Sequence, residues 1–373
     1  MIYLDYAATT PLNNEVLESF VAFNKKFFAN PSSAHKLGAE MSRFESKARE
    51  QIASLFGVTS DEVIFTSGAT ESNNLAIKGT AFKYQNRGKH IITSKGEHPS
   101  VLHTFEQLEE TFGFKVTYLN LNEDGTVNLD ELEKAMDDET ILVSIMAVNN
   151  EVGAINDPKV IGKIVHKFPK AFFHSDATQA IGKIDLDYSD TDLISLSAHK
   201  LNGFKGSGLL IKKKNVDLMP VASGGGQEFG LRSGTNNVPY EMSLAKTLRL
   251  AFEKQKEHYD YACFLNNYLR EELSKINGIT FNSGKKASPF ILDIGILKKA
   301  SVVSEALSNK EIYVSTKSAC SSKRTPFSHV LKAMGKDELA CQNALRISIS
   351  HLTTKEELTV FVKELKNILE TVK

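Results

Sequence analysis

Three side chains that can carry or share a proton follow short apolar segments of this sequence. Lys200 ends "LISLSAHK", Asp176 lies near the end of "AFFHSDA", and His98 follows "HIITSKGE". Each has an ordinary explanation: a surface lysine, an aspartate that caps the next helix, or a structural histidine. A lysine beside a buried wall can also lose its charge and act as a nucleophile toward carbonyl groups. The three residues therefore indicate chemistry only if the fold brings them together.

The segment "VIFTSGATESNNLAIKG" (63–79) adds a candidate anion site. A strand leads into a turn of small residues, and a helix is expected to begin near Thr70. Free N–H groups at a helix start, beside the Ser67 and Thr70 hydroxyls, favour an anion. The ordinary alternative is a capped turn that uses Thr70 and Glu71. Neither GxGxxG after a strand nor GxxxxGK[ST] is present, which argues against a dinucleotide or P-loop site.

Two more polar residues sit beside apolar segments, Asn149 in "MAVNNEVG" and Arg346 in "ALRISIS". An arginine in an apolar strand suggests a clamp for a carboxylate, and a structural ion pair is the alternative. Taken together, an anion turn, an acid, a lysine and a histidine at strand ends match the needs of pyridoxal phosphate (PLP). That cofactor requires a Schiff-base lysine, an acid at its ring nitrogen and a phosphate cradle.

One cysteine lies in an unusually polar setting. Cys320 stands in "STKSACSSKR" (315–324), among residues that favour solvent. Cys263 and Cys341 lie in helical apolar patterns, where a buried thiol is inert. An odd number of distant cysteines fits a reducing compartment rather than a disulfide framework, and no spacing indicates zinc. Cys320 is therefore the candidate reactive thiol.

Strand and helix patterns alternate through the middle of the chain, which predicts an α/β fold with a largely parallel, helix-covered sheet. Such sheets bind ligands at the carboxyl ends of their strands. The expected strands are 90–94, 115–121, 141–148, 171–177, 193–199 and 207–213, and the expected helices include 99–112, 158–168, 238–276 and 354–372. We expect a large domain over 15–255, and a smaller α+β domain from 1–14 and 256–373 that carries a loop at about 317–328.

The composition excludes some classes of function. Lys plus Arg is 45 and Asp plus Glu is 45, so bulk charge does not favour nucleic acid or a membrane surface. No apolar run is long enough to span a membrane, and the first residues do not read as a signal peptide, so a cytoplasmic protein is expected.

Short motifs follow one another along the chain in this order: "YLDYAATTP", "NPSSAH", "FTSGATESNNLAIKG", "HIITSKGEH", "VNNEVG", "DATQA", "SAHK", "RSGT" and "SAC". With this series the chain resembles the cysteine desulfurases of the NifS/IscS kind. These are class-V aminotransferase-like PLP enzymes of fold-type I. The resemblance runs nearly end to end. It implies a mostly parallel seven-stranded sheet domain, a smaller α+β domain and a homodimer.

The resemblance also implies roles at the cofactor. Lys200 would form the Schiff base with PLP, Asp176 would pair with the ring nitrogen, and Gln179 would reach the phenolic oxygen. His98 would stack on the ring and shuttle protons. The phosphate would be held by Ala69, Thr70, Ser197 and His199, with Thr235 reaching across from the neighbouring subunit. Asn149 and Arg346 would orient the substrate, and Arg346 would grip its carboxylate.

The implied reaction converts L-cysteine to L-alanine and leaves a persulfide on Cys320. The sulfur then passes to an acceptor protein. The long loop resembles the type I enzymes, and Lys317, Lys323 and Arg324 are expected to lower the thiol pKa. Because the sequence ends soon after the last expected helix, supply to a tRNA-thiolating enzyme is expected as readily as iron–sulfur cluster assembly. No direct nucleic-acid contact is expected.

Five positions depart from the family pattern: Lys317, Phe204, Gln227, Phe229 and Ser350. None removes an expected catalytic group. The alternatives are a selenocysteine lyase or cysteine C–S lyase on the same fold, and a catalytically silent partner subunit. Only desulfuration requires the loop cysteine.

Overall fold

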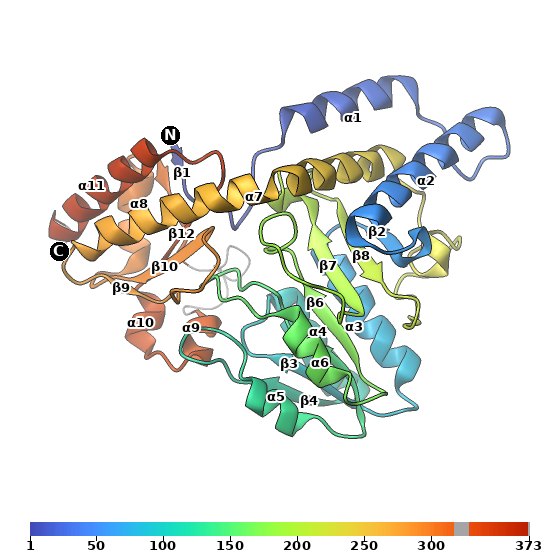
Figure 1. Ribbon diagram of the computed structural model, residues 1–373, viewed down its shortest axis with the longest axis horizontal. Helices are drawn as coiled ribbons and strands as arrows, with labels where there is room; N and C mark the ends of the chain where they lie inside the picture. Colours follow the sequence, from blue (N-terminus) through green and yellow to red (C-terminus); the bar gives the residue numbers. More distant parts are fainter. Residues whose placement is uncertain (317–327, 372–373) are drawn as a thin grey trace.

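The computed structural model describes residues 1–316 and 328–371. Its largest unit is a seven-stranded sheet of order β2-β8-β7-β6-β5-β3-β4 (Figure 1). Within this sheet β8 runs antiparallel to β2 and β7, and the other neighbours are parallel. The strands are β2 (Val63–Thr66), β3 (His90–Ser94), β4 (Lys115–Leu119), β5 (Thr140–Ser144), β6 (Phe172–Asp176), β7 (Leu193–Ser197) and β8 (Gly208–Lys212). The predicted mostly parallel seven-stranded sheet is confirmed.

Helices cover both faces of this sheet because its central strands are apolar on both sides. Successive residues of a strand point to opposite faces. Ile91 packs in the core formed with α3 (Ala69–Tyr84) and α4 (Pro99–Phe112). Its neighbour Ile92 packs in the core formed with α5 (Leu129–Ala135) and α6 (Pro158–Val165). The rest of that second face is covered by α2 (Lys36–Phe56) and α7 (Val238–Ser274).

A smaller unit is built from both ends of the chain. Its antiparallel sheet has the order β12-β10-β9, with β9 (Thr280–Phe281), β10 (Ile291–Gly295) and β12 (Ala344–Ser348). Near the chain start, β1 (Ile2–Tyr3) pairs in parallel with β11 (Ile312–Tyr313). The helices of this unit are α8 (Ala300–Ser308), α9 (His329–Ala333), α10 (Glu338–Gln342) and α11 (Lys355–Thr371).

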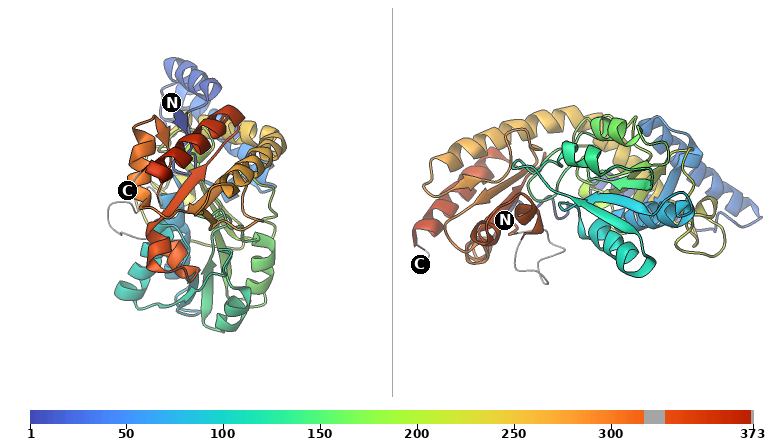
Figure 2. Two further views of the ribbon diagram at one scale, coloured as in Figure 1. Left: turned by 90° about the vertical axis from the view of Figure 1, so that its left-hand side faces the viewer. Right: turned by 90° about the horizontal axis from the view of Figure 1, so that it is seen from below.

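The two units are joined by α7, which runs unbroken from the large sheet to the small one (Figures 1 and 2). The predicted helical connection over 238–276 is therefore confirmed. Helix α1 (Asn14–Lys26) lies outside α7, on the side away from the large sheet (Figure 1). The domain boundary predicted at 255 falls inside α7 and stays a prediction.

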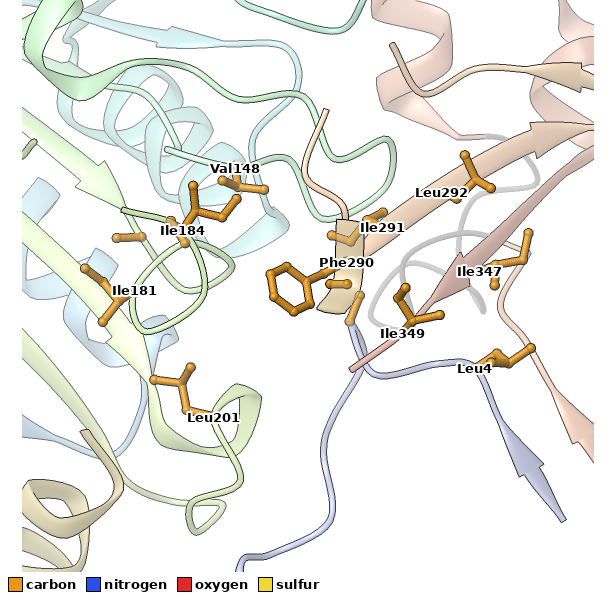
Figure 3. Close-up of a cluster of buried hydrophobic side chains, with 14 of the residues drawn as sticks. Leu4, Val148, Ile181, Ile184, Leu201, Phe290, Ile291, Leu292, Ile347 and Ile349 are labelled. Atoms are coloured by element: carbon orange, nitrogen blue, oxygen red, sulfur yellow. The ribbon is translucent and has the colours of Figure 1, made fainter. Parts of the chain in front are cut away.

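Apolar side chains fill the junction between the two units. Phe290, Ile291 and Ile349 of the small unit lie in one buried cluster with Ile181 and Leu201 of the large one (Figure 3). This packing fixes the small unit against the carboxyl-end edge of the large sheet. Within the described part of the chain, every helix is too short or too polar to cross a membrane.

Candidate active site

A cavity of about 150 Å³ lies at the carboxyl ends of the parallel strands. Residues that follow β3, β5, β6 and β7 line it, together with the start of α3 and residues near the chain start. Most of the predicted site residues meet there: Ala69, Thr70, His98, Asp176, Gln179, Ser197, His199, Lys200 and Arg346. The sheet topology thus brings together residues that are far apart in sequence.

Asp176 is the last residue of β6 and is buried. Its Oδ2 accepts a hydrogen bond from Asn73 Nδ2 at 2.8 Å, and its Oδ1 accepts one from the Thr178 N–H at 3.0 Å. A buried carboxylate without partners would cost several kcal/mol. These two donors stabilise it and fix its orientation toward the cavity.

Lys200 ends the short 3-10 turn Ala198–Lys200 that follows β7. Its Nζ donates to the carbonyl oxygens of Ala7 at 2.6 Å and Ala8 at 2.5 Å. Close by, Thr10 donates to the His199 carbonyl through both its N–H and its hydroxyl. The segment after β1 therefore lies directly against the lysine.

The imidazole of His199 carries no positive charge near neutral pH. Burial lowers its pKa to about 4, and the neighbouring charges of Lys200, Lys205 and Lys183 lower it as well. Its Nδ1 lies 3.1 Å from the Thr9 hydroxyl. His199 is therefore neutral near pH 7.

His98 follows β3 and is the N-cap residue of α4. Burial is the main factor that lowers its pKa; Asp176 opposes this effect, and Lys200 adds to it. The ring lines the same cavity as Asp176 and Lys200. A neutral imidazole thus faces the acid and the lysine.

The start of α3 has unusually close backbone packing. Its N-cap residue Gly68 has φ 146° and offers no side-chain cap. The Ala69 N–H instead donates to Ser197 Oγ at 2.7 Å. A Cβ on Gly208 would lie 2.3 Å from Gly68 Cα, so only glycine allows β8 to approach this turn. The turn therefore presents the positive end of α3, beside Thr70, to the cavity.

Gln179 is held from two sides. Its Nε2 donates to the Ala7 carbonyl at 2.9 Å, and its Oε1 accepts from Lys183 Nζ at 3.0 Å. The lysine is only a donor and the carbonyl only an acceptor, so the amide orientation is determined. The second hydrogen on Nε2 is left to donate elsewhere.

Arg346 lies on β12 and is 1% exposed. Its guanidinium pairs with Asp5 at 2.7 Å and donates to the Asn150 carbonyl at 2.8 Å. Its Nε is buried without a partner in the described part of the chain. Arg346 is therefore in an ion pair here, and its Nε–H is still available to donate.

Two predicted residues lie outside this cavity. The Asn149 amide accepts from the N–H groups of Glu151 and Val152 and donates to the Gly96 carbonyl, while Asn150 lines the cavity. Thr235 is exposed and lines a separate pocket that shares no residue with the Lys200 cavity. Asn149 therefore holds the loop that contains Asn150. Thr235 could contact a phosphate in this cavity only from a second subunit.

Four residues fall outside the described ranges: Cys320, the predicted nucleophile, and Lys317, Lys323 and Arg324, which are expected to tune its thiol. The described neighbour on the C-terminal side is Ser328, the N-cap of α9. Its hydroxyl donates to the buried Glu151 carboxylate at 2.5 Å, and His329 lies 3.0 Å from the Glu97 carbonyl. The start of α9 is therefore bonded to the carboxyl-end edge of the large sheet.

The sequence profile of the family described as aminotransferase class-V matches residues 2–361. The chain belongs to the class-V aminotransferase family. The chain is 41% identical over 376 residues to the "NifS/IcsS protein homolog" of Lactobacillus delbrueckii subsp. bulgaricus, covering 99% of this chain and 97% of that protein. It is 40% identical over 375 residues to "Cysteine desulfurase IscS" of Dictyoglomus turgidum, covering 99% and 94%. A solved "NIFS-LIKE PROTEIN" has a TM-score of 0.93 at 39% identity, with 100% of both chains covered. The resemblance stated from the sequence is confirmed.

Sequence reasoning missed several polar residues of this site. Asn73 bonds to Asp176, Asp5 pairs with Arg346, and Glu97 is fully buried beside His98. All three stand in segments that carried the resemblance, which was the available signal. Their roles depend on contacts between distant segments, and no local pattern specifies those contacts.

Proposed function

We propose that this chain is a PLP-dependent cysteine desulfurase that converts L-cysteine to L-alanine and leaves the sulfur as a persulfide on Cys320. One observation carries the proposal: Lys200, Asp176 and His98 line one cavity. They do so in a chain that matches relatives named cysteine desulfurase along almost its whole length.

The residues of the cavity fit PLP. Lys200 supplies the amine, Asp176 an oriented acid for the ring nitrogen, and the start of α3 a site for the phosphate. The Thr178 hydroxyl lines the same cavity and is buried without a partner among the described residues. When bound, PLP would draw electrons away from the substrate Cα, which eases loss of its proton.

The other residues would hold the cofactor and the substrate in place. Ala69, Thr70, Ser197 and His199 would surround the phosphate, with Thr235 of a second subunit, and Gln179 would donate to the phenolic oxygen. Arg346 would bind the substrate carboxylate, which requires that its pair with Asp5 loosen or be shared. Asn149 would act by holding the loop that presents Asn150.

Sulfur transfer would use the thiolate of Cys320. That sulfur attacks the substrate sulfur, the substrate carbon–sulfur bond breaks, and a sulfur–sulfur bond forms. The electron pair stays with the substrate carbon, which takes up a proton and leaves as alanine. Cysteine and thiol thus become alanine and persulfide, and no outside oxidant or reductant is needed.

We propose a cytoplasmic homodimer that passes sulfur to an acceptor protein. An iron–sulfur scaffold and a tRNA-thiolating enzyme are both compatible with the sequence. Relatives named cysteine desulfurase support transfer of the sulfur to an acceptor.

Single turnover with L-cysteine, followed by mass spectrometry of intact protein and peptides, tests the function. The peptide containing Cys320 should gain one sulfur atom as one alanine is released. Cys320→Ser should abolish the gain, whereas the matched control Cys263→Ser should keep it. Alanine release without the gain would indicate a lyase, and no release of alanine would contradict the proposal.

A further inference from the structure

The ring nitrogen Nδ1 of His98 accepts a hydrogen bond from the backbone. The Ser100 N–H donates to it at 3.2 Å, which caps the start of α4. A backbone N–H is only a donor, so Nδ1 must present a lone pair. In a neutral imidazole whose Nδ1 is unprotonated, the proton is on Nε2.

The hydroxyl of Ser100 makes a second hydrogen bond to the same nitrogen. Ser100 Oγ lies 2.8 Å from His98 Nδ1. Because Nδ1 has no hydrogen to give, the hydroxyl is the donor. The Ser100 oxygen in turn accepts from Asn73 Nδ2 at 2.9 Å, which leaves the hydroxyl hydrogen directed at His98.

Asn73 connects this pair to the acid of the site. Its Nδ2 donates one hydrogen to Ser100 and the other to Asp176 Oδ2 at 2.8 Å. The carboxylate accepts hydrogen bonds, so the nitrogen of the amide must face it. The opposite orientation would place Asn73 Oδ1, which is buried without a partner among the described residues, against a like-charged oxygen.

From this chain of bonds we infer that His98 is held neutral with its single proton on Nε2, and that Asn73 and Ser100 are the positioning residues that hold it so. In the series Asp176, Asn73, Ser100, His98, only one assignment of donors and acceptors gives every hydrogen an acceptor. The series joins four elements, β6, α3, α4 and the turn after β3. The protonation state of the His98 imidazole is therefore coupled to Asp176, the acid that lines the same cavity.

The electrostatic surroundings agree with a neutral ring. Burial is the main factor that lowers the pKa of His98; Asp176 and Glu151 raise it, while Lys200 and His329 lower it further. Protonation at Nδ1 would also point a new hydrogen at the Ser100 N–H. The ring would have to lose both of its accepted bonds to become an imidazolium.

The consequence for the reaction rests on the proposed function, whereas the proton position does not. A ring with its proton on Nε2 offers a hydrogen-bond donor on the edge opposite Nδ1. It cannot take a proton at Nε2 while that hydrogen is present. The resemblance implied that His98 shuttles protons; with its proton on Nε2 it instead acts as a fixed hydrogen-bond donor, and another group must take the proton from the substrate Cα.

Two-bond ¹H–¹⁵N spectra of protein labelled with ¹⁵N-histidine test the proton position. The His98 signals are assigned by their loss in His98→Gln, and spectra are recorded with and without added PLP. We expect a protonated Nε2 and an unprotonated Nδ1 in both samples. A proton on Nδ1, or two protonated nitrogens at neutral pH, would overturn the inference even if the enzyme releases alanine.

Variants test the two positioning residues. Ser100→Ala removes one of the two bonds to Nδ1 and should make His98 roughly threefold to tenfold easier to protonate. Asn73→Ala should have a similar effect, and the effect should vanish in the Ser100→Ala background if Asn73 acts through Ser100. Asn74→Ala is the control, because the side chain of this half-buried neighbour donates to the Thr70 carbonyl and, among the described residues, to neither Ser100 nor Asp176. Equal effects of Asn73→Ala in both backgrounds would contradict the positioning role.

Discussion

At the scale of single residues, the site is built from polar groups that are already paired before a ligand binds. Asp176 accepts two hydrogen bonds, Lys200 donates to two carbonyls, and Gln179 is fixed from both sides. Buried polar groups are costly unless they are paired, so these bonds maintain the geometry. A substrate or cofactor that binds would replace some of these hydrogen bonds with its own. It would not have to immobilise flexible side chains.

Glu97, next to His98 in the chain, is a further buried acid beside this set. Its carboxylate accepts from the Ser94 hydroxyl at 2.7 Å and from the Met146 N–H at 2.9 Å. Burial raises its pKa to about 8, and the charge of Asp176 adds to the increase. The folded protein therefore keeps a proton on Glu97 at pH values where the unfolded chain has released it.

This difference predicts a pH-dependent stability. Below the ordinary glutamate pKa both states are protonated, so the contribution of Glu97 is fully present. It is lost as the pH rises toward about 8, because unfolding then releases a proton. The wild-type minus Glu97→Gln difference in unfolding free energy should fall by on the order of 3 to 4 kcal/mol between about pH 5 and about pH 8. Urea unfolding followed by circular dichroism measures it, and a difference that rises with pH would refute the assignment.

At the scale of elements, the turn between β2 and α3 depends on two glycines. Gly68 adopts a conformation that side chains rarely tolerate, and Gly208 of β8 packs against its backbone. The atoms that a Cβ on Gly208 would meet are backbone atoms of Gly68 and Leu196, which cannot rotate away. The position of the α3 start therefore depends on the lack of a side chain at Gly208.

Gly208→Ala should destabilise the fold by about 2 kcal/mol or more and weaken retention of PLP, because the α3 start must move. Gly206→Ala, two residues earlier in the turn before β8, is the control. It has φ 76° with open space around its Cβ, so it should cost only about 1 kcal/mol and leave PLP retention unchanged. Urea unfolding and absorbance of bound PLP report the two effects. Equal loss of PLP from both variants would show that close packing at Gly208 does not matter.

At the scale of the whole molecule, the site combines segments from the two ends and the middle of the chain. Arg346 comes from the small sheet, Asp5 from the chain start and Asn150 from a loop of the large sheet. The apolar junction around Phe290 keeps these segments together (Figure 3). The geometry of the site therefore depends on docking of the small unit.

The predicted role of Thr235 belongs to this scale, because it requires a second subunit. If Thr235 serves its neighbour, a hybrid dimer of Lys200→Ala and Thr235→Ala subunits should regain one site with both residues intact. The hybrid can be isolated with two affinity tags and compared with both parent dimers for PLP affinity and alanine release. Recovery is expected in the hybrid. A hybrid as weak as its parents, or a protein that elutes as a monomer, would contradict the intersubunit role.

Much of the fold could be predicted from local patterns. The expected helix 99–112 coincides with α4, and the expected strand 90–94 with β3. The expected helix 354–372 matches α11, which Thr354 caps by accepting from the Glu357 N–H. The expected strand 141–148 was too long: β5 ends at Ser144, and of the buried apolar residues that follow, Met146 and Val148 line the cavity. Apolar composition marks burial, and it does not distinguish a strand from a buried loop.

The sequence by itself determined the alternation of strands and helices, the identity of the lysine, acid and histidine, and the family. Those properties are local, because they follow from side-chain periodicity and from short segments in a fixed order. Only the tertiary structure decided which partner each polar group has: Asn73 for Asp176, Asp5 for Arg346, Ser100 for His98. Hydrogen bonds act over about 3 Å and depend on angle, so their partners are fixed only when distant segments pack together.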